Sequence, residues 1–245
     1  MRTFLSLSAA ACLLLAANVR ADDDPQKVIE KAIKAHGERA GKGKAAVFKM
    51  KGKFYGLGEG IDFTADFKIQ EPSQNRMDLT IEVAGEKVEI VQAIDGDKGW
   101  KSAAGNAEDL NKDELAEAKE NIYAERVNRF VDLREKSYKL SSLGEKKVGD
   151  RQAVGVKVSH EGHREISLYF DKEKGLLLVS ERRGKDPMTG QEFTQETLYE
   201  DYKPIDGVQQ AHKTTINRDG KKYVEGDITD FKRLDEIDAS TFVKP

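Results

Sequence analysis

The sequence predicts a mainly β protein of the α+β class, in which a strongly curved antiparallel sheet wraps around helices. The first observation is strict alternation of apolar and polar residues from Ile61 to Gln70, which is typical of a strand with one buried and one solvated face. The second is about a dozen short segments of similar character, separated by turns such as Asp219-Gly220. The third is two helical segments. A sheet this wide with one apolar face must curl and be covered.

Residues 1–21 have the features of a secretory signal peptide. Arg2 provides the positive start, and the apolar stretch 4–17 is shorter than the roughly 20 residues that a membrane-spanning helix needs. Cleavage is expected after Ala21, so we expect a periplasmic or secreted protein. Residues Ala9-Ala10-Ala11-Cys12 faintly resemble a bacterial lipidation box. In that alternative Cys12, the only cysteine, would be the acylated first residue of the mature chain. A cysteine inside a removed segment is the favoured interpretation.

The mature chain, residues 22–245, is expected to form one acidic domain. The full sequence has 41 basic and 44 acidic residues. Because the signal segment contains Arg2 and Arg20, its removal leaves 39 basic residues and a net charge of −5. This balance argues against nucleic acid or an anionic membrane as the main partner, since both attract net positive charge. Without a cysteine, the mature chain uses neither disulfides nor thiol chemistry.

Two helices are expected. The first covers Pro25–His36, because Asp24 can cap it, proline is tolerated at the first position and Gly37 can end it. The second covers residues 113–135, which contain strong helix formers and neither glycine nor proline.

Strands are expected on both sides of the second helix. Those before it are Ala46–Tyr55, Ile61–Gln70, Arg76–Val83, Val88–Ile94 and Gly99–Ser102. Those after it are Tyr138–Leu143, Gln152–His160, His163–Phe170, Leu176–Arg183, Glu192–Tyr202, Ala211–Arg218 and Tyr223–Arg233.

No pattern in the sequence is typical of a catalytic centre. Acid–base catalysis most often uses histidine, and the chain has four. His160 and His163 flank the turn Glu161-Gly162, but a zinc site needs three or four ligands, so we interpret the pair as part of a polar hairpin. Asp95-Gly96-Asp97 lacks the distal glutamate of a calcium loop. We therefore expect no enzyme activity, no metal and no cofactor.

Four local patterns, taken in order, resemble one known family. They are Glu71-Pro72 before Asn75-Arg76-Met77-Asp78, then Ala93-Ile94-Asp95-Gly96-Asp97-Lys98-Gly99-Trp100, then Leu168-Tyr169-Phe170-Asp171 before Lys174-Gly175-Leu176, and finally Tyr202-Lys203-Pro204-Ile205-Asp206-Gly207-Val208. Over residues 25–245 the chain resembles the LolA/LppX-like superfamily of periplasmic lipoprotein carriers, as a distant member. The resemblance implies an unclosed β-barrel whose helices cover an apolar cavity on the concave face. The chain departs from the family at Gln209-Gln210-Ala211, where a proline is usual.

The candidate binding site is the apolar face of the sheet. Twelve side chains are candidates for lining a space that accepts an acyl chain: Phe48, Met50, Phe54, Ile61, Phe63, Phe67, Ile69, Met77, Leu79, Ile81, Trp100 and Phe130. Each alone is more often ordinary core, but the covering helices are few for so wide a sheet. We expect a monomeric carrier or binder of a lipid or an acylated lipoprotein, with membrane-bound proteins as further partners. The alternative is an exported, non-enzymatic interaction or scaffold protein whose helices fill the space.

Overall fold

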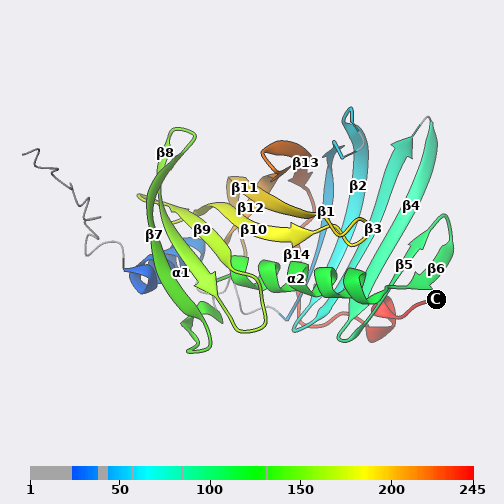
Figure 1. Ribbon diagram of the computed structural model, residues 1–245, viewed down its shortest axis with the longest axis horizontal. Helices are drawn as coiled ribbons and strands as arrows, with labels where there is room; N and C mark the ends of the chain where they lie inside the picture. The colour runs from blue at the N-terminus through cyan, green and yellow to red at the C-terminus, as the bar shows by residue number, and fades with distance from the viewer. Residues whose placement is uncertain (1–23, 38–43, 57, 84, 131) are drawn as a thin grey trace, which may run out of the picture.

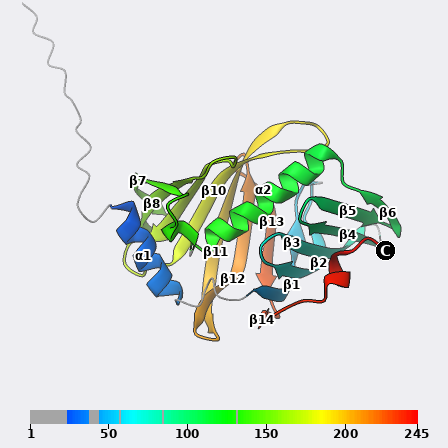
Figure 2. The same ribbon diagram turned by 90° about the horizontal axis from the view of Figure 1, so that it is seen from below.

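The structure is a computed structural model that describes residues 24–37, 44–56, 58–83, 85–130 and 132–245. Within these residues, fourteen strands form one antiparallel sheet, and two α-helices pack against it (Figures 1 and 2). The expected signal peptide, with Cys12, lies outside the described residues. Among the described helices, none is long and apolar enough to cross a membrane.

The helices are α1 (Pro25–His36), α2 (Lys112–Asn128) and the short 3-10 helices η2 (Asp132–Arg134) and η3 (Ala239–Phe242). The strands before α2 are β1 (Ala45–Phe54), β2 (Ile61–Gln70), β3 (Gln74–Val83), β4 (Glu86–Asp95), β5 (Lys98–Ala103) and β6 (Asn106–Asp109). The strands after it are β7 (Lys139–Val148), β8 (Arg151–Ser159), β9 (Ile166–Asp171), β10 (Leu177–Lys185), β11 (Glu192–Ile205), β12 (Val208–Arg218), β13 (Lys221–Ile228) and β14 (Lys232–Leu234).

The sheet consists of two runs that meet between β1 and β13. β1 to β6 pair in sequence order, β7 to β13 do the same, and antiparallel pairing of β1 with β13 joins the runs (Figure 1). β14 also pairs with β1. β6 and β7 are the two edges, and no strand pairing in the described part of the chain joins them. The expected unclosed, mainly β architecture is therefore confirmed.

α1 forms where the sequence predicted it. The Asp24 carboxylate accepts a hydrogen bond from the backbone of Gln26, and Pro25 opens the first turn. Val28, Ile29 and other apolar residues of α1 are buried against the sheet. The helix ends at Gly37, whose φ of 93° a side chain would disfavour.

α2 begins at a capping box but ends earlier than predicted. The Asn111 side chain accepts hydrogen bonds from the backbone of Asp113 and Glu114, and Glu114 accepts one from the backbone of Asn111. The predicted helix to residue 135 is wrong beyond Asn128. Phe130 has a φ of 40°, a left-handed conformation that turns the chain and directs the ring into the core.

Two further strand predictions differ from the structure. β6 was not predicted, because its four residues are all exposed and show no alternation. The single strand expected over residues 223–233 is divided into β13 and β14. Between the pairs Met50–Ile228 and Val47–Lys232, three residues of the C-terminal segment oppose two of β1, so an extra residue interrupts the ladder as a β-bulge does.

The main core lies at the β7–β9 end of the sheet, where α1 and the second half of α2 pack on β8 and β9. Its largest fully buried members include Ile29, Phe130, Leu168 and Phe170. This core fixes both helices to one end of the sheet and determines which face α2 can cover.

Candidate functional site

Strand pairing places most of the predicted apolar side chains on one face of the sheet. Phe48 pairs with Phe67 and Phe67 with Met77, and directly paired residues of antiparallel strands point to the same side. With the alternation along each strand, this rule groups ten of the twelve candidates. We call these ten the apolar face: Phe48, Met50, Phe54, Ile61, Phe63, Phe67, Ile69, Met77, Leu79 and Ile81.

The apolar face continues onto neighbouring strands through residues that the sequence analysis did not select. Leu79 pairs with Ile90 of β4, and Phe54 pairs with Val224 of β13. The alternation Val88-Glu89-Ile90 was a usable signal for β4. For β13 the signal was weaker, because Gly226 interrupts the apolar positions.

α2 lies over the same face. Near its start, the Glu114 carboxylate accepts a hydrogen bond of 2.6 Å from Lys101, which strand pairing places on the side of Met77. Near its end, Asn128 donates a hydrogen bond of 2.8 Å to the Tyr199 hydroxyl on β11. Figure 2 shows α2 running across the sheet. We call the α2 side of the sheet the inner face and the opposite side the outer face.

Burial differs sharply along the inner face. At the β8–β9 end, Val156, Val158 and Leu168 are 0% exposed beneath the helices. On the apolar face, Phe63 is buried and the other nine side chains remain partly exposed. Covering such surface with an apolar molecule releases about 25 cal/mol for each Å² removed from water. The β1–β3 part of the inner face therefore presents apolar surface that the protein itself covers only in part.

Aromatic contacts organise the apolar face. The rings of Phe48 and Phe67 stack with their centroids 4.7 Å apart, and the Phe231 ring also stacks on Phe48, at 6.0 Å. At the far end of β1, Phe54 contacts Tyr223 edge-to-face at 5.0 Å. These ring contacts hold the large side chains of the apolar face in place.

The prediction that Trp100 belongs to this face is wrong. Trp100 pairs with Ala93, and Ala93 pairs with Arg76, so all three lie on the outer face. The Trp100 indole donates a hydrogen bond of 2.9 Å to the Phe242 carbonyl, and the Arg76 guanidinium lies 5.5 Å from the ring. Trp100 thus fixes the C-terminal segment to the sheet, and the short strand Gly99–Ser102 gave no alternation from which its side could be read.

Phe130 lies on the inner side but in the closed core. It is 1% exposed and contacts His36 and Phe170 edge-to-face, at centroid distances of 4.6 and 5.6 Å. These contacts leave its ring no surface for a ligand, so the structure does not bring Phe130 together with the apolar face.

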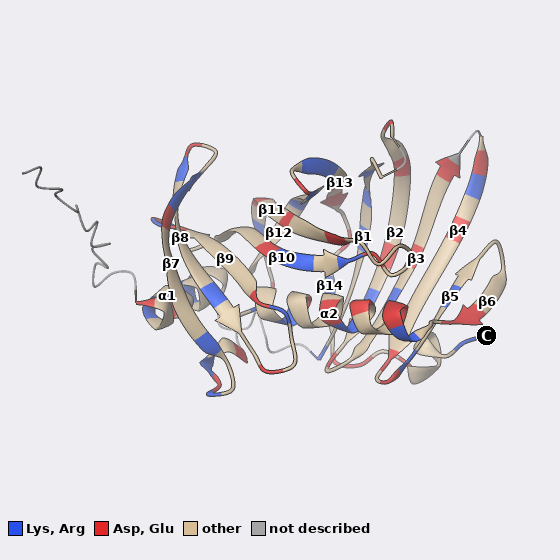
Figure 3. Cartoon of the chain, in the orientation of Figure 1, with Lys and Arg blue, Asp and Glu red and all other residues tan. Residues whose placement is uncertain are grey.

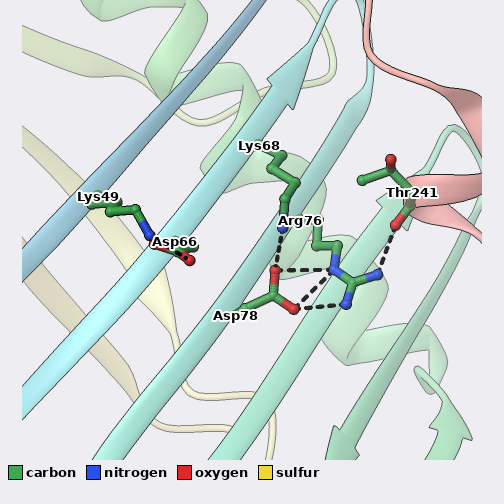
Figure 4. Close-up of polar contacts among 6 residues, drawn as sticks. All are labelled: Lys49, Asp66, Lys68, Arg76, Asp78 and Thr241. Atoms are coloured by element: carbon green, nitrogen blue, oxygen red, sulfur yellow. Dashed lines mark hydrogen bonds and ion pairs between the residues drawn. The ribbon is translucent and has the colours of Figure 1, made fainter. Parts of the chain in front are cut away.

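The outer face of β1–β4 carries charge instead of apolar surface. Figure 4 shows Lys68 and Arg76 bound to Asp78, with Arg76 also donating to the Thr241 carbonyl, and Lys49 paired with Asp66. A shallow depression of about 480 Å³ lies over these strands, and Lys49, Asp66 and Asp78 line it. Paired charges suit water better than an acyl chain, so this depression is no part of the candidate site.

The inner face also carries two arginines that the sequence analysis missed. Arg182 of β10 pairs with Gln195, which pairs with Arg218 at the end of β12. Arg182 lies 3.4 Å from the Glu117 carboxylate of α2, which also binds Arg164 at 2.5 Å. Figure 3 shows that α2 carries both acidic and basic residues. Arg218 lies two positions after Ile216, so both residues lie on the same face of β12. This spacing was a usable signal for the side on which Arg218 lies.

The histidine hairpin serves to attach α2. His163 and the Glu120 carboxylate of α2 are hydrogen-bonded at 2.8 Å, and the His163 ring stacks on Tyr123 at 3.9 Å. His160 lies 5.4 Å from His163, ring to ring. In the part of the chain that the structure describes, no three side chains of metal-binding type gather at one point.

Comparison with known proteins identifies the fold class, an unclosed antiparallel half-barrel crossed by a helix. No protein-family model matches the sequence, and no curated protein matches it. Among solved structures, the chain is similar to a LolA superfamily protein from Nitrosomonas europaea, with a TM-score of 0.57, 12% identity and coverage of 90% of this chain and 97% of that one.

Two further structures have the same arrangement. A DUF1329 family protein from Desulfovibrio piger has a TM-score of 0.59 at 9% identity, and a proposed outer membrane lipoprotein-sorting domain from Vibrio parahaemolyticus has a TM-score of 0.54 at 13% identity. Each match covers 89% of this chain and 97% of the other. The chain therefore has the LolA-like fold that the sequence patterns implied, and identities this low establish the fold alone.

Proposed function

We propose that this chain is an exported, non-enzymatic carrier or binding protein that holds an apolar ligand on the apolar face beneath α2. The ligand class is a lipid, or the acyl chain of a lipoprotein. The observation that carries the proposal is the partial exposure of nine large apolar side chains on the helix-covered side of the sheet. A protein without a ligand or partner there would gain stability by burying them.

Apolar contact with an acyl chain supplies binding free energy in such a role. Burying one methylene group is worth about 0.8 kcal/mol, so contact along eight methylenes supplies about 6 kcal/mol before the entropic costs of binding are subtracted. A longer contact adds about 0.8 kcal/mol for each further methylene and needs no specific polar contact.

The attachment of α2 favours access to the apolar face. Over the β4–β6 end of the sheet, α2 is held by the ion pairs Lys101–Glu114 and Lys119–Asp97, in which Lys101 and Lys119 are partly exposed. Partly exposed ion pairs contribute about 0–1 kcal/mol each. The first turn of α2 can therefore move away from the β4–β6 end of the sheet at small cost, while Glu117 and the main core hold the rest of the helix.

The export and location of the protein belong to the same proposal. A signal peptide over residues 1–21 would deliver the chain to the periplasm, where a fold shared with a LolA superfamily protein and a proposed lipoprotein-sorting domain suits a lipid carrier. Acyl chains would be its main partners.

Two neighbouring residues on opposite faces provide the test. Leu79→Asp places a charge on the apolar face, whereas Thr80→Asp places the same charge on the outer face. The affinity for a fluorescent fatty acid should fall at least tenfold in Leu79→Asp. It should stay near the wild-type value in Thr80→Asp. Circular dichroism establishes that both variants are folded.

Native mass spectrometry of protein purified from its own host complements this test, and we expect a bound lipid. An empty protein that also fails to bind the fluorescent fatty acid would refute the carrier function. It would favour the exported interaction protein instead.

A further inference from the structure

Arg218 has an unusual environment on the inner face. Its guanidinium lies between two aromatic rings, 4.1 Å from the centroid of Phe193 and 3.7 Å from that of Tyr223. Its Nε atom is buried and has no hydrogen-bond partner, and no hydrogen bond or ion pair joins the Arg218 side chain to another described residue. Buried polar atoms are nearly always paired, so this one calls for an explanation.

The nearby carboxylates are already occupied. Glu117 and Asp186 both interact with the Arg218 charge at longer range. However, Glu117 binds Arg164 and Arg182, and one Asp186 oxygen accepts hydrogen bonds from the backbone of Met188 and Thr189. Burial lowers the pKa of the Arg218 guanidinium, and the positive charge of Arg182 acts in the same direction. The guanidinium therefore lacks a direct counter-ion.

The position of the Phe193 ring beside Arg218 depends on a glycine of the neighbouring strand. A Cβ atom at Gly184 would lie 2.4 Å from the Phe193 ring, so the glycine makes room for the ring that supports Arg218. The same Cβ position is 3.3 Å from a Glu117 oxygen of α2, which places the cluster between α2 and the sheet.

The cluster is continuous with the apolar face. Tyr223, which stacks on Arg218, contacts Phe54 at 5.0 Å, and Phe54 pairs with Ile61. A molecule lying on the apolar face would thus reach an unpaired cation at one end. Planar guanidinium groups bind carboxylate and phosphate oxygens through two parallel hydrogen bonds.

We propose that Arg218 binds the carboxylate or phosphate headgroup of an anionic amphiphile whose acyl chain lies on the apolar face. The inference rests on the proposed function and specifies its ligand class. A neutral lipid of the same chain length would make the apolar contacts and leave the guanidinium without an acceptor.

The test compares three probes on the full mature chain: a fluorescent fatty acid, its methyl ester and inorganic phosphate. Wild-type protein should bind the acid at least tenfold more tightly than the ester. Arg218→Gln should lose most of this difference by weakening the acid alone. Arg183→Gln is the matched control, because Arg183 lies on the opposite face with its side chain 70% exposed, and it should retain the full difference.

The outcomes separate this inference from the proposed function. Equal affinity of wild-type protein for acid and ester would overturn the headgroup site and leave the carrier function intact. No binding of either probe would overturn both. Arg218-dependent binding of phosphate without any preference for the acid would make the site one for free anions and would also overturn the inference. The wild-type comparison needs no variant, so it stands even if Arg218→Gln fails to fold.

Discussion

The Trp100 indole nitrogen donates a hydrogen bond to the backbone carbonyl oxygen of Phe242, which lies 142 positions further along the chain. Through this contact η3 covers the outer face of β3–β5, where Arg76 also donates to the carbonyl of Thr241. The Phe242 ring is 1% exposed and packs with Ala45 and Ile237 in a small core of its own. The C-terminal segment therefore covers the Trp100 end of the outer face, whereas on the inner face nine apolar side chains remain partly exposed beneath α2.

Phe242→Ala should destabilise the protein by about 3–5 kcal/mol, because it removes a fully buried aromatic ring and leaves a cavity. Val243→Ala is the control, since Val243 is 58% exposed, and it should change the free energy of unfolding by less than about 0.5 kcal/mol. Urea unfolding followed by Trp100 fluorescence measures both values. Equal effects of the two substitutions would contradict the described packing of η3.

The protein should become less stable as the pH is lowered, because of His36. This side chain is 6% exposed, its Nδ1 is hydrogen-bonded to the Ala32 carbonyl, and its Nε2 faces the Leu177 backbone nitrogen at 3.4 Å. Burial lowers the pKa of His36 from 6.5 to about 4. Between these values the unfolded chain binds a proton that the folded chain does not, so stability is lost as pH falls from 6.5 towards 4.

The difference between the His36 pKa in the unfolded chain and in the folded protein corresponds to a loss of about 3 kcal/mol. His36→Gln should remove that part of the pH dependence, whereas His212→Gln controls for the loss of a histidine elsewhere. Free energies of unfolding at pH 7 and pH 4 give the comparison. An unchanged difference between the two pH values in His36→Gln would refute the assignment.

The sequence predicted the sheet well because alternation depends only on which side of a strand is buried. It thereby grouped the ten residues of the apolar face. It failed for Trp100, whose side is decided by pairing through Ala93 with Arg76 and not by any local pattern. It also failed for the end of α2, where the left-handed conformation of Phe130 comes from burial of its ring, since helix propensity alone favours continuation.

The two inner-face arginines illustrate a different limit. Arg182 and Arg218 are far apart in sequence and come together only because Gln195 lies between them in the sheet. A charged residue near the end of a predicted strand is normally solvated. Only the rings of Phe193 and Tyr223 show that the Arg218 guanidinium is partly removed from water.

Tyr199→Phe should weaken the anchoring of α2. The Tyr199 hydroxyl accepts a hydrogen bond from Asn128 and lies 3.1 Å from the Ser180 hydroxyl, so its removal leaves a partly buried amide without a partner. The expected cost is about 1–3 kcal/mol. Tyr55→Phe, which removes a tyrosine hydroxyl from the hairpin end of β1, is the control and should cost less. Thermal unfolding measures both, and hydrogen exchange should show faster exchange in α2 for Tyr199→Phe only.

Gly184→Ala should displace the Phe193 ring. The added methyl group would lie 2.4 Å from Phe193 Cζ, closer than atoms can approach, so either the ring or β10 must move. Overpacking of this kind costs about 1–3 kcal/mol. A smaller side chain at position 193 relieves the contact. Phe193→Leu should therefore destabilise the Gly184→Ala protein less than it destabilises the wild type.

The double-mutant cycle isolates this coupling from the separate effects of each substitution. Free energies of unfolding for the four proteins should give an interaction of at least about 0.5 kcal/mol. The double variant should be more stable than the sum of the two single effects predicts. Additive effects would mean that Gly184 and Phe193 do not touch. The Phe193 ring would then be free to leave Arg218, and the aromatic support of that guanidinium would lose its structural basis.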